Sequence, residues 1–188
     1  MSLLPNLGSI GSGVSNFYKG VATTSVRFED ANTPFLTYTP DSNSTGDKKK
    51  WVWAAWIKRG GLGVGDATLF GSVNAGTSQT TINILNAGAI NVSSSGSGLA
   101  GISITSTNLL RDSSAWYHLA VAIDTTQGTS TNRVLVYLNG SQVTDLSATT
   151  YPNENTEGTV NQANEAIDVG RFNQSGVNQE FDGYLADI

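Results

Sequence analysis

The sequence predicts an all-β fold, an antiparallel two-sheet β-sandwich, from three observations. Strand-like runs recur about every 8 to 12 residues and are separated by Gly-, Asn- and Ser-rich turns, which is the spacing expected of a sandwich. No long segment has the 3.6-residue apolar period of an amphipathic helix. Charged residues make up only 13% of the chain, and the abundance of Ser, Thr, Asn and Gly favours polar β-surfaces over helical ones.

The expected strands follow one another from residue 25 to the end of the chain. Turn-forming segments separate them, among them residues 59–63, 74–76 and 93–98. The segment Thr107–Asp112 could instead form a short helix. The expected strands are Ser25–Glu29, Phe35–Tyr38, Trp51–Lys58, Thr68–Val73, Thr80–Leu85, Ala89–Val92, Ile102–Ser106, Tyr117–Ile123, Arg133–Leu138, Gln142–Leu146, Ala166–Gly170 and Phe181–Ile188.

The clearest strand pattern lies in residues 117–138. The first strand alternates bulky with smaller side chains, so that one face carries Tyr117, Leu119, Val121 and Ile123. A polar loop follows, and the next strand again places apolar side chains at every second position. Asn139-Gly140 then predicts a type I′ hairpin turn, because that turn needs positive φ at both central residues.

The third expected strand is rich in tryptophan. Trp51 and Trp53 share one face, while Trp56 lies on the other, and bulk on both faces predicts a strand buried between two layers. Trp53, Trp56 and Trp116 are therefore expected in the core, and the position of Trp51 is left open.

Composition excludes several classes of protein. A net charge of −5 and a cationic cluster limited to Lys48–Lys50 argue against nucleic-acid binding. The absence of cysteine fits assembly in a reducing cytoplasm. The N-terminus lacks the basic and apolar regions of a secretory signal, and no apolar run is long enough to predict membrane insertion.

Four segments together resemble the laminin G-like (concanavalin A-like) jelly-roll domains of tail-fibre and other virion proteins of tailed bacteriophages. They are Val26–Phe28, the Trp-rich Trp51–Arg59, the Trp-Tyr-His strand with its Asp-Thr-Thr loop and R-V-x-V-Y-L-N-G-S-Q-V hairpin within Ala115–Val143, and Phe181–Ile188. The resemblance covers about residues 23 to 188 and implies a jelly-roll sandwich. In the resembled family a further segment follows the closing strand, so we expect the sandwich to be cut at its C-terminal end.

Residues 1–22 stand apart as a Gly/Ser-rich N-terminal arm, and residues 23–188 are expected to form the sandwich. The arm is either a flexible tail or a virion-docking segment that orders only against a partner. In the second case its apolar residues would dock: Leu3, Leu4, Leu7, Ile10 and Phe17.

Catalysis is not expected. Glycoside hydrolases of concanavalin A-like fold place carboxylates on one strand, and retaining chemistry needs two of them about 5 Å apart. Glu180 and Asp182 begin such a pattern, but Leu185 stands where a third carboxylate belongs. His118, the single histidine, is expected to be structural. A glycoside hydrolase is kept as a second alternative only.

No cofactor is expected, apart from a Ca²⁺ ion of the kind that laminin G-like and lectin-like relatives bind at the sandwich rim. Ca²⁺ takes six to eight oxygen ligands. Asp124 and Asp182 are the candidates, although the acidic residues are scattered singly and solvated turn carboxylates are the other interpretation.

Carbohydrate recognition needs aromatic rings on loops, against which a sugar ring stacks, and amides that bind its hydroxyls. Tyr151 with Asn153 and Phe172 with Asn173 supply both groups. The alternative is that these side chains only pack their own loops.

The expected function is that of a non-enzymatic virion protein, a fibre protein or surface-displayed adhesin whose lectin-like domain contacts a host-surface glycan or protein. The alternative is a capsid decoration protein docked through its N-terminal arm. The expected partners are other virion proteins and a host-cell glycan, and the family resemblance implies a homotrimer. The expected location is the virion, assembled in the host cytoplasm.

Overall fold

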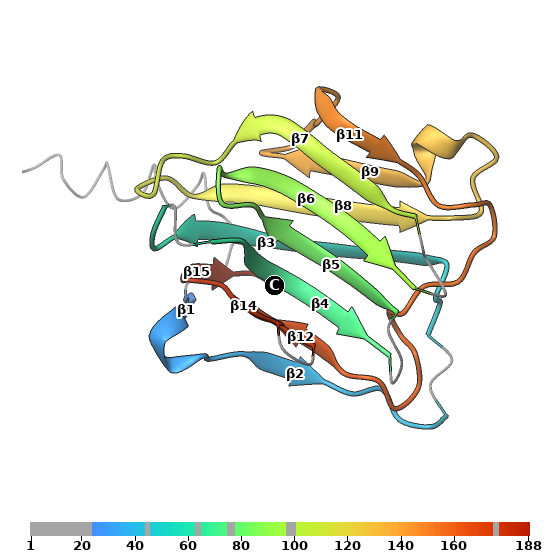
Figure 1. Cartoon of the computed structure of the whole chain (residues 1–188), viewed down its shortest axis with the longest axis horizontal. Helices are drawn as coiled ribbons and strands as arrows, with labels where there is room; N and C mark the ends of the chain where they lie inside the picture. The colour runs from blue at the N-terminus through green and yellow to red at the C-terminus, as the bar shows by residue number, and fades with distance from the viewer. Residues whose placement is uncertain (1–23, 44–45, 63–64, 75–77, 97–100, 175–176) are drawn as a thin grey trace, which may run out of the picture.

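The computed structural model describes residues 24–43, 46–62, 65–74, 78–96, 101–174 and 177–188. These form two antiparallel sheets that pack face to face around one core, with a separate two-stranded hairpin beside them (Figure 1). The described residues contain two short 3₁₀ turns, Asp30–Asn32 and Ser130–Asn132, and no α-helix. The all-β sandwich prediction is therefore confirmed.

Sheet A has six strands. Its spatial order is β1 (Val26–Phe28), β15 (Gly183–Ala186), β3 (Lys50–Arg59), β8 (Tyr117–Asp124), β9 (Val134–Leu138) and β10 (Ser141–Gln142). The expected hairpin turn is present, because Asn139 and Gly140 have φ values of 50° and 81° and Ser141 pairs with Leu138.

Sheet B has seven strands. Its spatial order is β11 (Leu146–Thr150), β7 (Ser103–Leu109), β6 (Ala89–Ser95), β5 (Gln79–Ile84), β4 (Ala67–Val73), β12 (Ile167–Val169) and β2 (Leu36–Tyr38). The remaining hairpin joins β13 (Arg171–Gln174) to β14 (Val177–Glu180).

Several expected bounds were wrong. The segment 107–112 contains no helix, since β7 continues to Leu109 and pairs there with Ala89 of β6. The single strand expected over residues 142–146 is two strands, because the chain leaves sheet A after Gln142 and enters sheet B at Leu146. The hairpin of β13 and β14 was not expected, because its sequence is polar and lacks a strand-like alternation.

The core lies between the sheets and follows the two-residue period of the strands. Leu119, Val121 and Ile123 of β8 are buried against Ile82 and Ile84 of β5 within one apolar cluster. Each fully buried side chain of this size contributes about 1.5–3 kcal/mol to stability. The inward alternation predicted for residues 117–123 is therefore the pattern that builds the sandwich.

The tryptophans divide between the core and the surface. Trp53 is buried as expected, and Trp51 packs against Phe70 with ring centroids 5.6 Å apart. The core prediction was wrong for the other two. Trp56 lies on the outer face of sheet A with its ring 5.1 Å from His118, and Trp116 is 37% exposed. No other layer of the described chain covers that face, so bulk on both sides of a strand did not mean burial on both.

Among the described residues, no helix is long and apolar enough to span a membrane. The N-terminal arm with its five docking candidates lies outside the described residues, so the arm and its docking role stay predictions.

A glycine turn places the β13–β14 hairpin over sheet B. Gly170 has a φ of 87°, and a side chain there would collide with the ring of Phe28. The chain reverses at this point and lays β13 against β4. A Cβ on Gly71 of β4 would lie 3.2 Å from the Arg171 carbonyl oxygen and 3.3 Å from the Phe172 ring, so glycine permits this close approach.

Candidate binding site on the outer face of sheet B

The outer face of sheet B carries rows of polar side chains that run across the strands. In one row Gly71 pairs with Thr81, and Thr81 pairs with Ser93. The next row joins Asn83 to Asn91. Side chains at alternate positions of these strands, such as Ile82, point into the core, so the polar residues face outward.

This face is hollowed beside the hairpin. A depression of about 310 Å³, called here the polar hollow, is lined mainly by amide and hydroxyl side chains. The lining residues are Asp66, Gln79, Thr81, Asn83, Leu85, Asn91, Ser93, Phe172 and Gln179.

A hydrogen-bonded ladder fixes the orientation of these groups. The Thr68 hydroxyl donates to Asn83 Oδ1 at 2.8 Å, and Asn83 Nδ2 donates to the Thr81 hydroxyl at 3.0 Å. The Thr81 and Ser93 hydroxyls lie 2.9 Å apart. Neighbouring bonds hold each side chain in one rotamer, so a ligand would meet an ordered array of donors and acceptors.

One acceptor in the polar hollow is unsatisfied. Gln79 Oε1 is buried and has no hydrogen-bond partner among the described residues. A buried polar atom without a partner is uncommon and costs free energy, about 1–3 kcal/mol when its donor is missing. A ligand hydroxyl that donates to this oxygen would remove the cost.

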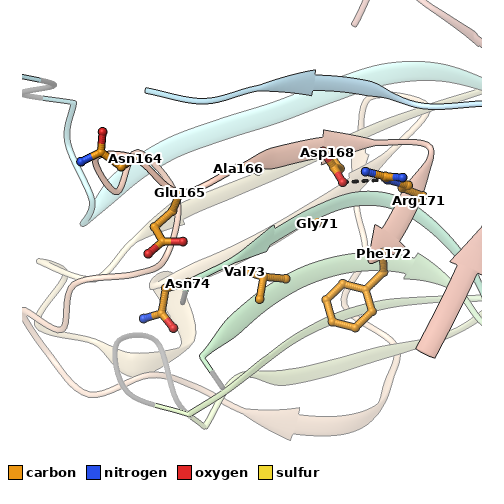
Figure 2. A pocket seen from close by; sticks show the side chains of 9 residues that line it. All are labelled: Gly71, Val73, Asn74, Asn164, Glu165, Ala166, Asp168, Arg171 and Phe172. Carbon is orange, nitrogen blue, oxygen red and sulfur yellow. Dashed lines mark hydrogen bonds and ion pairs between the residues drawn. The ribbon is translucent and has the colours of Figure 1, made fainter. Parts of the chain in front are cut away.

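A second depression of about 330 Å³, called here the charged hollow, lies on the other side of Phe172 (Figure 2). Strands β4, β12 and β13 line it together with the turn before β12. Its charged side chains are Glu165, Asp168 and Arg171. Figure 2 shows Glu165 and Asn74 facing each other at one end, and Asp168 beside Arg171 at the other.

The arginine of the charged hollow is held by its neighbours. Arg171 Nε donates to Asp168 Oδ2 at 2.8 Å, and its guanidinium carbon lies 3.1 Å from the centroid of the Phe35 ring. Asp168 is 8% exposed, and its other oxygen, Oδ1, has no hydrogen-bond partner among the described residues. Each hollow therefore contains one buried acceptor without a donor.

Phe172, one of the predicted sugar-binding residues, forms the wall between the two hollows. It lines both, but the residue is only 5% exposed and its ring packs over Gly71. The ring therefore shapes the hollows and offers little area for stacking. The side chain of Asn173, the next residue of β13, lies outside the described residues.

Tyr151 and Asn153 lie elsewhere. Tyr151 is half-buried against the core and lines a hollow of about 200 Å³ between β7, β9 and β11, which shares no lining residue with the polar or the charged hollow. Asn153 is exposed two residues later, in a loop held by a hydrogen bond of 2.9 Å from Arg133 to the Pro152 carbonyl. The structure thus divides the four predicted carbohydrate residues between two places, and their role stays a prediction.

The two calcium candidates are separate, and each has protein partners. Asp124 accepts hydrogen bonds from the Thr126 hydroxyl at 2.6 Å and from Gln127 Nε2 at 2.7 Å. These bonds, that from Thr126 first, lower the pKa of Asp124 below its usual value. Asp182 forms an ion pair of 2.6 Å with Arg27. No group of three or more acidic, His or Cys side chains that could hold a metal ion occurs in the part of the chain that the structure describes.

Sequence reasoning missed the polar rows. Their signal was present as Thr81-x-Asn83 in β5 and Asn91-x-Ser93 in β6, two polar pairs with apolar residues between and beside them. A period of two places each pair on one face. Only the sheet order, which sets β5 beside β6, reveals that the two pairs meet.

Comparisons with known proteins agree on the fold. A family model described as the concanavalin A-like lectin/glucanases superfamily, of laminin G type, matches residues 30–188. No curated protein sequence matches this chain.

Among solved structures, the LG1–3 region of the laminin α2 chain is 14% identical, with a TM-score of 0.62 over 88% of this chain and 30% of its own length. A candidate carbohydrate-binding protein from Bacteroides ovatus is 16% identical, with a TM-score of 0.59 over 88% of this chain and 42% of its own. The carbohydrate-binding module CBM40 of a Ruminococcus gnavus sialidase, solved with α2,3-sialyllactose, is 11% identical, with a TM-score of 0.51 over 87% of this chain and 89% of its own. The chain thus spans less than half of the first two proteins, and the likeness shows a shared fold.

Proposed function

The chain belongs to the concanavalin A-like lectin/glucanase superfamily, and from this premise we propose that it is a non-enzymatic glycan-binding module that uses the outer face of sheet B. The observation that carries the proposal is the polar hollow, whose lining contains both a hydrogen-bonded ladder of amides and hydroxyls and the residue Gln79 with its unsatisfied Oε1. Sugars present many hydroxyls that both donate and accept hydrogen bonds, and such an array matches them.

The structural neighbours support this assignment. The matching structures include laminin G domains, a candidate carbohydrate-binding protein and a carbohydrate-binding module. Of the two carboxylates that begin the hydrolase pattern, Glu180 and Asp182, the second already forms an ion pair of 2.6 Å with Arg27. Binding without turnover is the function that these contacts favour.

A binding assay tests the proposal. The full chain is applied to an immobilised panel of neutral, acidic and amino-sugar glycans, and the best ligand is titrated by calorimetry. Asn91→Ala removes an outward-facing amide that donates to the Thr105 hydroxyl at 3.0 Å, and we expect a loss of affinity of about tenfold with little change in Tm. Asn108→Ala, an exposed amide of β7 outside the hollow, is the matched control. Equal affinities for the two variants, or no glycan bound at all, would contradict the assignment.

We further propose that the module acts on a tailed-phage virion, as a fibre protein or surface-displayed adhesin. The four segments that resemble phage virion domains support this context. A homotrimer would present several weak sugar sites together, and multivalency adds about two to four decades of avidity.

A capsid decoration protein is the second candidate, and the apolar residues of the N-terminal arm favour it. Labelled electron microscopy of purified particles separates the two: label at the tail fits the adhesin, and label over the head fits decoration. If decoration is correct, removal of residues 1–20 abolishes attachment to the head and leaves the Tm of the sandwich unchanged.

A further inference from the structure

The charge of the two hollows is unbalanced. Among the residues that the structure describes, their lining includes three carboxylates, Asp66, Glu165 and Asp168, and a single cation, Arg171. A ligand on this face therefore enters a region whose formal charges sum to a negative value at neutral pH.

The cation described in this lining already has a protein carboxylate as its partner. Arg171 is bound to Asp168 through Nε and covered on one side by the Phe35 ring. Recognition of a carboxylate by arginine works best through a bidentate pair, and here a protein carboxylate already occupies the Nε edge of the guanidinium. The positive charge is thus largely cancelled before any ligand arrives.

The buried acceptors of this face call for donors. Asp168 Oδ1 and Gln79 Oε1 are both buried without a partner among the described residues, one in each hollow. Asp168 lines the charged hollow and is only 8% exposed, so its carboxylate is not freely solvated. A sugar hydroxyl can donate to either oxygen, whereas a ligand carboxylate would add a like charge beside Asp168.

We infer that the charged hollow is a selectivity subsite that accepts a hydroxyl-bearing, uncharged sugar through Asp168 Oδ1 and rejects acidic sugars. The inference rests on the proposed glycan-binding function and names its ligand class. The specificity has two parts, because Asp168 attracts the hydroxyl and, together with Glu165, repels the carboxylate.

Pairs of a neutral and an acidic sugar test the inference on the full chain. Lactose is compared with 3′-sialyllactose, and methyl-esterified oligogalacturonate with free oligogalacturonate, alongside the best neutral glycan of the panel and its carboxylated derivative. We expect the neutral member of each bound pair to bind at least about tenfold more tightly, with the difference shrinking as salt is raised. Equal affinity, or a preference for the acidic member, overturns the inference while leaving glycan binding intact. Failure of every probe overturns both.

Two variants test whether the charged hollow causes the preference for neutral over acidic sugars. Asp168→Asn keeps the shape of the side chain and is expected to reduce the neutral-to-acidic ratio to near one. Asp168→Asn also removes the ion pair with Arg171, so Glu165→Gln serves as a second variant. We expect Glu165→Gln to reduce the neutral-to-acidic affinity ratio, which is about ten in the wild type, by two- to threefold. Glu157→Gln makes the same change of charge in a loop outside the hollows and should leave the ratio unchanged. If Glu157→Gln lowers the ratio as much as Glu165→Gln does, the discrimination belongs to the overall charge of the protein and not to the hollow.

A chelator provides the last arm of the experiment. If EDTA abolishes the binding of neutral glycans, binding depends on a cation and not on a direct contact of the sugar with Asp168, and the inference fails. Binding that is unchanged in EDTA supports the direct contact.

Discussion

The outer faces of the two sheets follow the same strand alternation but carry opposite chemistry. On sheet B the outward rows are Thr, Ser and Asn side chains bonded to one another. On sheet A they include Ala54, Ala120 and Ala122, with Val52 68% exposed and Tyr184 37% exposed. The inward faces are alike and build the fold. The two sheets therefore differ in their outward faces, and the hollows lie on the polar one.

The largest expected effect separates the inward from the outward positions of one strand. Ile82→Ala in β5 leaves a cavity in the core and should lower the free energy of unfolding by about 2–5 kcal/mol, while the folded fraction still binds glycan. Thr81→Val, one residue earlier, removes hydroxyl bonds to Ser93 and Asn83 and should cost only about 1 kcal/mol but weaken binding. Urea unfolding gives the free energy of unfolding of both variants, and calorimetric titration gives their glycan affinity. A larger loss of affinity in folded Ile82→Ala than in Thr81→Val would contradict the division between inward and outward positions.

The next effect concerns the support of the hairpin. Gly71→Val places a branched side chain against the Arg171 carbonyl and the Phe172 ring, so the hairpin must shift and both hollows change shape. We expect a loss of stability of about 1–3 kcal/mol and a loss of binding of at least about tenfold. Val52→Thr, on the outer face of sheet A, is the control and should change stability by less than about 0.5 kcal/mol with no change in affinity. An unaltered affinity in Gly71→Val would show that the hairpin does not shape the site.

The smallest effect lies at the rim of sheet A. Hydrogen bonds from Thr126 and Gln127 lower the pKa of Asp124 in the folded protein, so its ionised form stabilises the fold above the unfolded pKa. This contribution is lost as the pH falls through the lower, folded value. We expect the Tm of Asp124→Asn to depend less steeply on pH than that of the wild type below about pH 4, with no change in glycan binding. Parallel Tm profiles of the two proteins would show that the loop bonds do not favour the ionised form.

The strands of strong periodicity could be predicted from the sequence, and the surface site could not. Alternation of bulky and small side chains predicted the strand over residues 117–123. The Asn139-Gly140 pair predicted the hairpin turn, because a need for positive φ leaves a local signal in the sequence. The bulk of Trp56 led to a wrong prediction of burial, because nothing local distinguishes a side chain that faces a second layer from one that faces solvent.

The hollows depend on contacts between residues far apart in the chain. Gly71, Thr81 and Asp168 share a row only because β12 returns to pair with β4 after nearly a hundred residues. Nothing local in the sequence singles out Asp168, since its unsatisfied oxygen and its pairing with Arg171 are properties of the folded chain. Tyr151 was chosen for its place in a polar loop, but packing against the core decided its orientation.

The hairpin of β13 and β14 forms no strand pairs with either main sheet. It packs against β4 at Gly71, where the absence of a side chain leaves room for it. Its ends, Gly170 and Phe181, are joined by a backbone hydrogen bond of 2.8 Å, so the chain enters and leaves the hairpin at almost the same point. A segment attached in this way forms one wall of each hollow and can be replaced as a unit. Hairpins of other lengths and sequences can be exchanged at residues 171–180 without disturbing a ladder of the sandwich, and each exchange would give the same scaffold a differently shaped pair of hollows.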